Sequence, residues 1–323
     1  MEYTVLGKTG VQVSELCFGT MSFGGPADRE TSRAMFERCR EAGINFFDTA
    51  DMYNNGLSEE ILGECISDCR DEVVLTTKVY NKVGADINKQ GLSRRHIQEG
   101  IEASLKRLDT DYVDLYFCHQ FDSRTAIEET LRAMDDLVRQ GKILYPAVSN
   151  WAAWQIEKAL GISREKNLSR FECIQPMYNL VKRQVEVEIL PMAQEENLGV
   201  IPYSPLGGGL LTGKYGVDKK PEKGRIVNND MYSQRYGEDI YFKIADRFVE
   251  HARKQGVSPV SLAVVWVKSH PAVTAPIIGA RNVEQLEDSL AAAEIDMTSE
   301  WRKEISELSM TPPPATDRLE EIK

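Results

Sequence analysis

Short apolar runs alternate with amphipathic segments along most of the chain. Eight of these runs are rich in β-branched and aromatic residues, and they show no strict alternation of apolar and polar positions. Parallel strands that are covered on both faces have this pattern. Pro146 lies inside the fifth run, where it removes a hydrogen-bond donor, so a bulge is one expectation there. The predicted strands are residues 15–21, 44–49, 72–79, 113–119, 143–149, 173–177, 199–204 and 273–279.

The segments between the apolar runs have the 3.6-residue periodicity of amphipathic helices. Ser58 and Ser93 are candidate N-caps, and Gly43, Gly141 and Gly199 lie near predicted helix ends. Two further helices are predicted at residues 258–270 and 299–308, outside the regular alternation. The helices that alternate with the strands are predicted at residues 31–41, 58–67, 93–108, 126–141, 154–160, 187–197, 239–255 and 283–293.

Eight β/α units in sequence imply a parallel sheet, which can be open or closed. An open sheet that binds a dinucleotide usually carries G-x-G-x-x-G after its first strand, and the segment "FGTMSFGG" lacks that spacing. The pattern therefore favours an α/β protein with one (β/α)8 TIM barrel domain over residues 1–323. Residues 3–13 are typical of an N-terminal β-hairpin, and a short Pro-rich tail, "TPPPATD", begins at about residue 311.

Charge and composition exclude several classes of partner. The net charge of −11 would repel nucleic acid and anionic membranes. The N-terminus lacks the basic and apolar regions of a signal peptide, and no stretch approaches the roughly 20 apolar residues of a membrane span. We therefore expect a cytoplasmic enzyme or binding protein with no nucleic-acid or membrane partner. The pattern indicates nothing about its oligomeric state.

The six cysteines and four histidines do not form a metal-binding pattern. Cys65 and Cys69 are one helical turn apart, unlike the paired C-x-x-C of a zinc site. The other cysteines lie in predicted strands or helices. Free cysteines tend to be buried, so we expect buried free thiols and no metal.

Polar residues gather at the carboxyl ends of the predicted strands, where TIM barrels place their chemistry. Taken singly, each has an ordinary explanation as a turn residue, a solvated charge or a satisfied histidine. Together at one mouth they would be hard to explain by solvation alone. The candidates are Asp48, Tyr53, Lys78, His119, Ser149, Asn150, Gln175, Tyr203 and Ser204.

Several longer motifs, in order along the chain, resemble those of the aldo-keto reductase superfamily. They are "FFDTADMYNNGLSEEILG", "LTTK", "LYFCH", "AVSNW", "IQPMYNL", "IPYSPLGGGLLTGKY" and "IIGARNVEQLEDSL". The opening "LGKTGVQVSELCFGT" is most similar to the branch that includes bacterial reductases and potassium-channel β subunits. The resemblance implies a barrel that binds NADPH without a Rossmann domain and reduces carbonyl groups.

The residue chemistry agrees with the roles that the resemblance implies. Tyr53 can donate a proton to a carbonyl oxygen, and an adjacent Lys78 ammonium would lower the pKa of that phenol from about 10. Asp48 can keep Lys78 charged and oriented. His119 can donate a hydrogen bond that orients the carbonyl and stabilises developing negative charge. Asp51 is interpreted as a loop residue.

The resemblance also implies a set of residues that hold NADP(H). Arg281, after the eighth strand, could meet a 2′-phosphate, and the helix that "GARN" opens could meet it through its N-terminus. The family often has a basic residue at the position of Gln285 and asparagine at that of Ser289, so the resemblance does not by itself decide between NADPH and NADH. The implied cofactor residues are Gly19, Thr20, Met21, Asp48, Ser149, Asn150, Gln175, Tyr203, Ser204, Pro205, Leu206, Gly208, Gly209, Leu210, Lys214, Gly279, Ala280, Arg281, Gln285, Asp288 and Ser289.

The connection over residues 205–238 exceeds the usual length of a βα loop. We expect residues 206–214 to lie against the pyrophosphate, and the segment to become more ordered when NADPH binds. The predicted substrate pocket is partly aromatic, which suits small aldehydes, diketones and quinones. Its candidate residues are Met21, Phe23, Tyr80, Gln120, Phe121 and Trp151.

Three alternatives remain beside a carbonyl reductase. "GGLLTGKY" fits G-x-x-x-x-G-K, but it ends in tyrosine where a P-loop needs Ser or Thr, which disfavours a nucleotide hydrolase. Lys78 could form a Schiff base in an aldolase, although the cofactor motifs would then have no role. An NADPH-binding sensor or subunit with little turnover is the third alternative.

Overall fold

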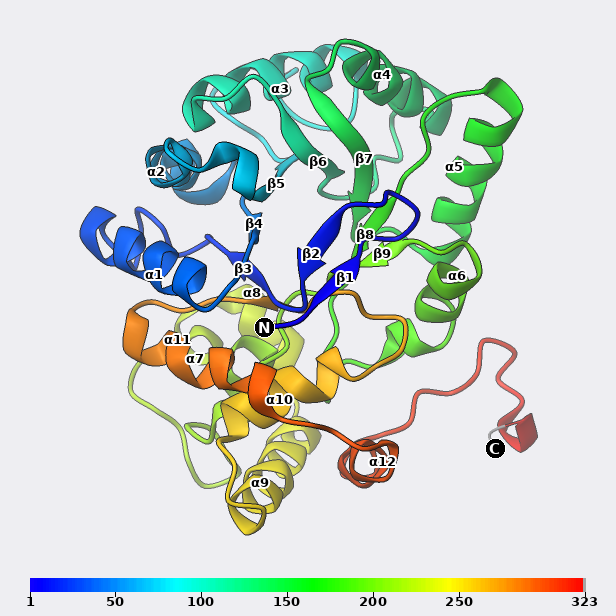
Figure 1. The fold of residues 1–323 in the computed structure, drawn as a ribbon. Coiled ribbons are helices and arrows are strands. Elements are labelled where there is room, and N and C mark those ends of the chain that lie inside the picture. The colour runs from blue at the N-terminus through cyan, green and yellow to red at the C-terminus, as the bar shows by residue number, and fades with distance from the viewer. Residues whose placement is uncertain (322–323) are drawn as a thin grey trace.

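Eight parallel strands form one sheet in the computed structural model, which describes residues 1–321 (Figure 1). Their order is β10-β3-β4-β5-β6-β7-β8-β9. The two end strands approach each other, because Ile277 N donates to Pro202 O at 2.9 Å and Thr274 N donates to Val200 O at 2.8 Å. The predicted (β/α)8 barrel is therefore confirmed. The strands are β3 (Cys17–Gly19), β4 (Phe46–Asp48), β5 (Val74–Val79), β6 (Val113–Cys118), β7 (Ile143–Ser149), β8 (Cys173–Gln175), β9 (Gly199–Val200) and β10 (Ile277–Ile278).

Each predicted strand is present, but several are shorter than their apolar runs. Residues 199–204 were predicted as one strand, whereas β9 ends at Val200. The chain continues past β9 with backbone hydrogen bonds from Ile201 N to Ile174 O and from Tyr203 N to Pro176 O, and with an isolated bridge between Met177 and Tyr203. Residues 201–203 therefore stay beside the neighbouring segment, although the paired strand has ended.

Helices surround the sheet in the predicted order (Figure 1). The two helices predicted outside the alternation are also present, as α10 and α12. Two short helices, α7 and α8, were not predicted. The helices are α1 (Arg29–Glu41), α2 (Leu57–Ile66), α3 (Arg94–Leu108), α4 (Ile127–Arg139), α5 (Ala153–Lys166), α6 (Ile189–Glu195), α7 (Arg225–Asn228), α8 (Asp230–Tyr236), α9 (Asp239–Lys254), α10 (Pro259–Lys268), α11 (Val283–Leu290) and α12 (Ser299–Ser306).

Only one of the two predicted serine caps is a cap. Ser93 caps α3 through a hydrogen bond from His96 N. Ser58 was wrongly predicted as a cap, since it lies within α2 and the N-cap is Gly56, at φ 91°. The Ser58 hydroxyl is fully buried and bonds instead to Thr20 and Thr49. A serine at a helix start can thus tie the helix to a neighbouring strand.

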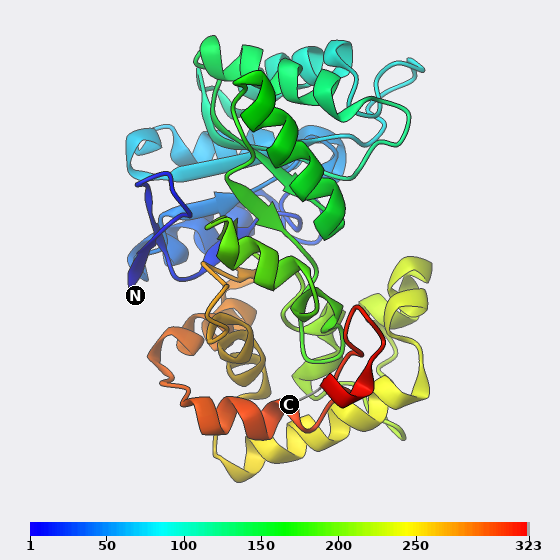
Figure 2. The ribbon, with the colours of Figure 1, turned by 90° about the vertical axis from the view of Figure 1, so that its right-hand side faces the viewer.

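The predicted N-terminal hairpin forms from β1 (Tyr3–Val5) and β2 (Gln12–Ser14), which pair antiparallel. Its Leu6 and Val13 are buried in one cluster with Cys17 and Phe46 of the barrel strands. Figure 2 shows the hairpin at one end of the barrel, while α8 and the loop after β5 lie at the opposite end. The hairpin therefore closes the end away from the candidate site.

No bulge forms at Pro146, so that expectation is wrong. The pairing of β6 with β7 runs unbroken through Tyr116 and Pro146. The Pro146 carbonyl accepts from Glu172 N at 3.0 Å, which turns the missing N–H toward β8. Because β8 begins only at Cys173, the proline lies where no strand partner is required.

The barrel has apolar packing on both sheet faces, which explains why its strands do not alternate. Every residue of β5 and β6 is buried. One cluster fills the interior, with Phe46, Leu115 and Phe117, and a larger one lies between strands and helices. All six cysteines are free thiols, four buried and two, Cys65 and Cys69, half-buried.

The segment over residues 205–238 folds into short helical pieces. These are a 3-10 turn, η4 (Gly207–Thr212), followed by α7 and α8. Tyr215, Tyr232 and Tyr236 are buried and tie the segment to the body of the protein. We call residues 205–238 the cover segment. Within residues 1–321, no helix has the length and apolar content needed to cross a membrane.

Candidate active site

A cavity of about 650 Å³ opens among residues at the carboxyl ends of the strands and the inner face of the cover segment. Asp48, Ser149 and Gln175, which end β4, β7 and β8, line its floor. Figure 2 shows the corresponding end of the barrel, opposite the hairpin. The predicted polar residues of the strand ends therefore meet in one space. This volume is within the range of small-molecule sites.

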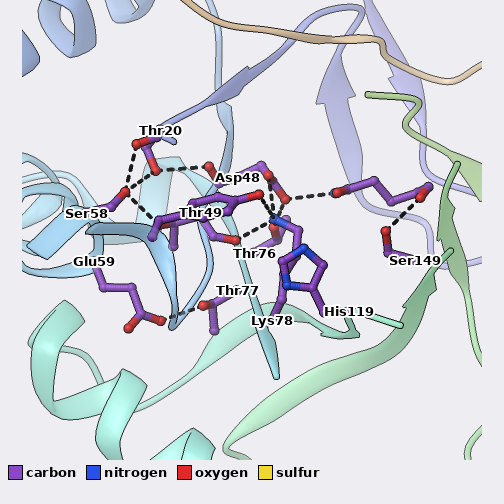
Figure 3. Close-up of polar contacts among 12 residues, drawn as sticks. Thr20, Asp48, Thr49, Ser58, Glu59, Thr76, Thr77, Lys78, His119 and Ser149 are labelled. Carbon is purple, nitrogen blue, oxygen red and sulfur yellow. Dashed lines mark hydrogen bonds and ion pairs between the residues drawn. The ribbon is translucent and has the colours of Figure 1, made fainter. Parts of the chain in front are cut away.

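Lys78 and Asp48 form an ion pair beneath the cavity floor (Figure 3). Lys78 Nζ lies 2.6 Å from Asp48 Oδ2 and 2.6 Å from the Thr49 carbonyl oxygen, and Lys78 has no exposed surface. The other Asp48 oxygen accepts from Thr76 and Gln175. Parallel pairing of β4 with β5 sets this geometry, because it places Asp48 beside Thr76, two residues before Lys78.

The ion pair keeps Lys78 charged in spite of its burial. Burial lowers the pKa of Lys78, but the Asp48 carboxylate and the Tyr53 phenol outweigh it and hold that pKa above its ordinary value. A charged ammonium cannot act as a nucleophile. Lys78 is therefore built as a fixed positive charge beneath the site.

Tyr53 connects this charge to the cavity. Its hydroxyl lies 3.4 Å from Lys78 Nζ, and its ring lines the cavity wall. Although part of the ring remains open to the cavity, protein packs it densely and raises the phenol pKa above its ordinary value; the Lys78 charge offsets only part of that rise. Lys78 thus acts on this pKa in the expected direction, but burial keeps the pKa above its ordinary value. Tyr53 keeps its proton at neutral pH.

His119 lies beside Tyr53, with the two ring centroids 6.1 Å apart and the planes nearly perpendicular. Burial and then the Lys78 charge lower the His119 pKa to about 3, so the ring is neutral at neutral pH. Asn81 Nδ2 lies 3.1 Å from His119 Nδ1. An amide N–H₂ can only donate, so Nδ1 accepts and Nε2 carries the ring proton. Sequence reasoning missed Asn81, which follows the third strand without a motif.

Asp51 is a loop residue, as interpreted, but it is also buried. Its carboxylate is 2% exposed and neither oxygen has a hydrogen-bond partner within residues 1–321. Burial, followed by the nearby Glu59 carboxylate, raises the Asp51 pKa to about 7. Glu59 differs, because it accepts from Thr77 and pairs with Arg107. A buried acid whose oxygens have no hydrogen-bond partner within residues 1–321 therefore lies two residues before Tyr53.

Polar groups on the far side of the cavity hold one another in place. Asn150, at a left-handed φ of 59°, donates to the His119 carbonyl oxygen at 2.9 Å and accepts from the Tyr203 hydroxyl at 2.7 Å. Ser149 donates to the Gln175 carbonyl oxygen at 2.8 Å. These bonds orient the amide and hydroxyl groups predicted to meet the nicotinamide.

Cations line the opposite part of the cavity. Lys214 follows η4, Arg225 begins α7, and Arg281 precedes α11. Burial lowers the Lys214 pKa, and the charges of Arg281 and Arg225 lower it further. Lys214 is thus close enough to Arg281 and Arg225 for their charges to repel its own. Arg225 had no sequence signal, because nothing in its segment distinguishes it from the surrounding charges.

The structure brings most of the predicted site residues to this cavity. Lys78 lies behind the wall, and Thr20 and Leu210 are fully buried outside it. Of the predicted substrate residues, Met21 and Gln120 line the cavity, and Phe23 is fully buried in the core. The predicted residues that line the cavity are Gly19, Met21, Asp48, Tyr53, His119, Ser149, Asn150, Gln175, Tyr203, Ser204, Pro205, Leu206, Gly208, Gly209, Lys214, Gly279, Ala280, Arg281, Gln285, Asp288 and Ser289.

A barrel with a charged lysine, a tyrosine and a neutral histidine at its mouth is the architecture of an oxidoreductase family. Residues 15–309 match the Aldo/keto reductase family, and the chain belongs to it. Members of this family generally use NAD(P)H. The predicted family and enzyme class are therefore confirmed.

Curated relatives match nearly the whole chain. It is 38% identical over 302 residues to a probable voltage-gated potassium channel subunit beta of Oryza sativa subsp. japonica, covering 91% of this chain and 92% of the relative. It is 37% identical over 320 residues to the uncharacterized oxidoreductase YrpG of Bacillus subtilis (strain 168), with 95% and 96% covered. It is 32% identical over 326 residues to the versiconal hemiacetal acetate reductase of Aspergillus parasiticus, with 93% and 94% covered.

Proposed function

We propose that this protein reduces aldehydes or ketones to alcohols with NADPH, with Tyr53 as the proton donor. The observation that carries the proposal is the chain of contacts from Asp48 through Lys78 to the Tyr53 hydroxyl, which faces the cavity beside His119. A buried charge held behind a cavity-facing phenol has no evident structural purpose, because burying an ion pair seldom adds stability.

The residues present fit NADP(H). The dinucleotide has a pyrophosphate and a 2′-phosphate, and Lys214, Arg225 and Arg281 have no carboxylate partner within residues 1–321. Gly208 and Gly209 have left-handed φ values of 66° and 96° in η4, a conformation that suits close backbone approach to a ligand. Ser149, Asn150 and Gln175 would hold the carboxamide, and Tyr203 would lie against the ring.

Bound NADPH would supply the hydride. Tyr53 Oη would donate its proton to the carbonyl oxygen as negative charge develops there, and Lys78 would stabilise the phenolate left behind. His119 Nε2–H would donate a hydrogen bond to the same oxygen, because Asn81 holds the ring in that tautomer. Asp48 would prevent Lys78 from losing its charge.

The test is replacement of Tyr53 by phenylalanine. Tyr53→Phe removes the proton donor while keeping the ring, so NADPH affinity should remain within about twofold. The kcat for aldehyde reduction should fall by two or more orders of magnitude, because general acid catalysis contributes about 10²–10⁴-fold. NADPH oxidation against a carbonyl panel measures the rate. Retention of most activity by the variant would reject the assignment.

A second candidate is an NADPH-binding subunit with little turnover, which the relatives named as potassium channel β subunits favour. Tight NADPH binding with no turnover of any carbonyl would support it. A Schiff-base aldolase is disfavoured, because Lys78 is charged and enclosed. Borohydride reduction in the presence of a carbonyl compound, which would trap a Schiff base, should therefore leave Lys78 unmodified.

A further inference from the structure

Four cations line the cavity, and none has a carboxylate partner among the residues that the structure describes. They are Lys214, Arg225, Arg235 and Arg281. For comparison, several half-buried arginines elsewhere are paired, as Arg70 is with Asp114 and Arg107 is with Glu59. The ion pairs of residues 1–321 include none of the four. In a chain of net charge −11, unpaired cations gathered in one cavity indicate anionic ligands.

Arg235 shares the Tyr232 ring with Arg225 but differs from the other three cations in the groups that its charge reaches. Arg225 and Arg281 both act on Lys214, whereas Arg235 acts instead on Tyr203 and Tyr236. Burial raises the pKa of Tyr203, and the positive charge of Arg235 opposes that rise. Tyr53 also raises the Tyr203 pKa. The Tyr203 hydroxyl donates to Asn150, and Asn150 donates to the His119 carbonyl oxygen. The contacts support the same placement. Arg235 lies against Tyr232, which stacks on Tyr236, and the Tyr236 hydroxyl donates to Met177, the bridge partner of Tyr203. Arg235 therefore lies toward the end of the cavity that holds Tyr203, which is the catalytic end.

The tertiary structure holds Arg235 in this position. It lies on α8, where its guanidinium carbon is 5.8 Å from the centroid of the Tyr232 ring. Tyr232 is 7% exposed and stacks on Tyr236, with centroids 6.4 Å apart. Asn179 donates to the Tyr236 hydroxyl, which anchors the stack to the loop after β8. Arg235 is half-buried on an anchored aromatic stack, so its side chain is already restricted. It would lose little further conformational freedom when a ligand binds.

Among the described residues that line the cavity, no acid at the catalytic end competes for Arg235. Asp48 is already neutralised by Lys78, and Tyr53 and His119 are both uncharged at neutral pH. Asp288 also lines the cavity, but it lies on α11, the helix that follows Arg281 in the chain. An anionic group on the substrate would therefore meet one uncompensated positive charge.

We propose that Arg235 binds an acidic group of the substrate, and that the protein acts on carbonyl compounds that also carry a carboxylate. The proposal rests on the reductase function above and names its substrate class. The reaction remains balanced in the same way: the carbonyl carbon gains a hydride, its oxygen gains the Tyr53 proton, and the carboxylate is unchanged. Arg235 acts as a specificity residue, because it contacts the substrate away from the reacting carbon.

The experiment compares each acid with an uncharged partner of similar shape. Suitable pairs are 4-formylbenzoate with methyl 4-formylbenzoate, 2-formylbenzoate with its methyl ester, and 4-oxobutanoate with butanal, which vary the distance from carboxylate to carbonyl. For at least one pair, kcat/KM should favour the acid. Arg235→Gln should lower kcat/KM for that acid about tenfold to a hundredfold, which corresponds to a charge-assisted hydrogen bond of ~1.5–3 kcal/mol. It should change kcat/KM for the ester or alkanal less than threefold.

Two variants serve as controls. Arg235→Lys keeps the charge but not the two-pronged geometry, so it should retain part of the preference for the acid. Arg225→Gln removes another unpaired arginine that contacts the same Tyr232 ring, at 5.5 Å. Arg225→Gln should weaken NADPH binding and leave the acid-to-ester ratio unchanged.

The outcomes separate this proposal from the function on which it rests. If the protein reduces uncharged carbonyls well and favours no acid in any pair, the substrate class is wrong and the reductase function stands. If Arg235→Gln raises the Kd for NADPH and leaves the acid-to-ester ratio unchanged, Arg235 serves the cofactor and the proposal is overturned. If no carbonyl is reduced at all, the reductase function itself fails.

Discussion

Replacing Asp51 by asparagine should make the protein more stable at alkaline pH than at acidic pH, relative to wild type. Asp51 is buried, and neither carboxylate oxygen has a hydrogen-bond partner within residues 1–321. Arg107, the cation that lowers the Asp51 pKa most, already pairs with Glu59. An ionised Asp51 would therefore be a buried charge without direct compensation.

The magnitude follows from the pKa. Burial, then Glu59, raises the Asp51 pKa from 3.8 to about 7. A pKa that is higher in the folded state means that the contribution to stability is complete below pH 3.8 and is lost as the pH rises through 7. At ~1.4 kcal/mol per pKa unit, the loss by pH 8.5 is ~4 kcal/mol. Asparagine cannot ionise, so Asp51→Asn avoids this loss, although its buried amide costs ~1–3 kcal/mol at every pH.

Urea unfolding at pH 5, 6, 7 and 8.5 measures the effect. The free energy of unfolding of Asp51→Asn minus that of wild type should rise by ~2–4 kcal/mol across this range. Asp122→Asn is the matched control. Burial raises the Asp122 pKa, but hydrogen bonds from Leu92 N and Arg124 N lower it overall, so its effect should be constant above pH 5. Parallel curves for wild type and Asp51→Asn would refute the reasoning.

Two further substitutions test the charges of the site. Lys78→Met should destabilise the protein by ~3–5 kcal/mol in urea unfolding, because Asp48 would remain buried without its cation. It should also lower kcat as Tyr53→Phe does. A variant as stable as wild type would show that the ion pair is not needed for stability. Arg281→Ala should weaken NADPH about tenfold to a hundredfold and leave NADH almost unchanged, as expected for a charge-assisted contact with the 2′-phosphate. Titration of protein fluorescence measures both affinities, and equal losses would indicate that Arg281 has only a structural role.

Much of the candidate site could be found in the sequence, because the ends of barrel strands can be recognised from the apolar pattern. Asp48 is the last residue of β4 and Lys78 is the last but one of β5, and every residue of both strands is buried. A polar side chain at either of these strand ends had to lie near the mouth. Local signals failed where contacts across the fold decide the outcome. Ser58 bonds to Thr20 and Thr49 instead of capping α2, and Pro146 lies beside a strand that has not yet begun.

The sequence by itself determined the barrel, the family and the residues at the strand ends, since periodicity and motif spacing are local properties of the chain. Only the tertiary structure decided which charges are compensated. Asp51, Arg225 and Arg235 look like ordinary loop or helix charges in the sequence. Their partners, or the lack of them, depend on segments far apart in the chain, as when Asn81 meets His119. The pKa of a charged side chain and the ligand that it can bind depend on these neighbours, which no local sequence pattern specifies.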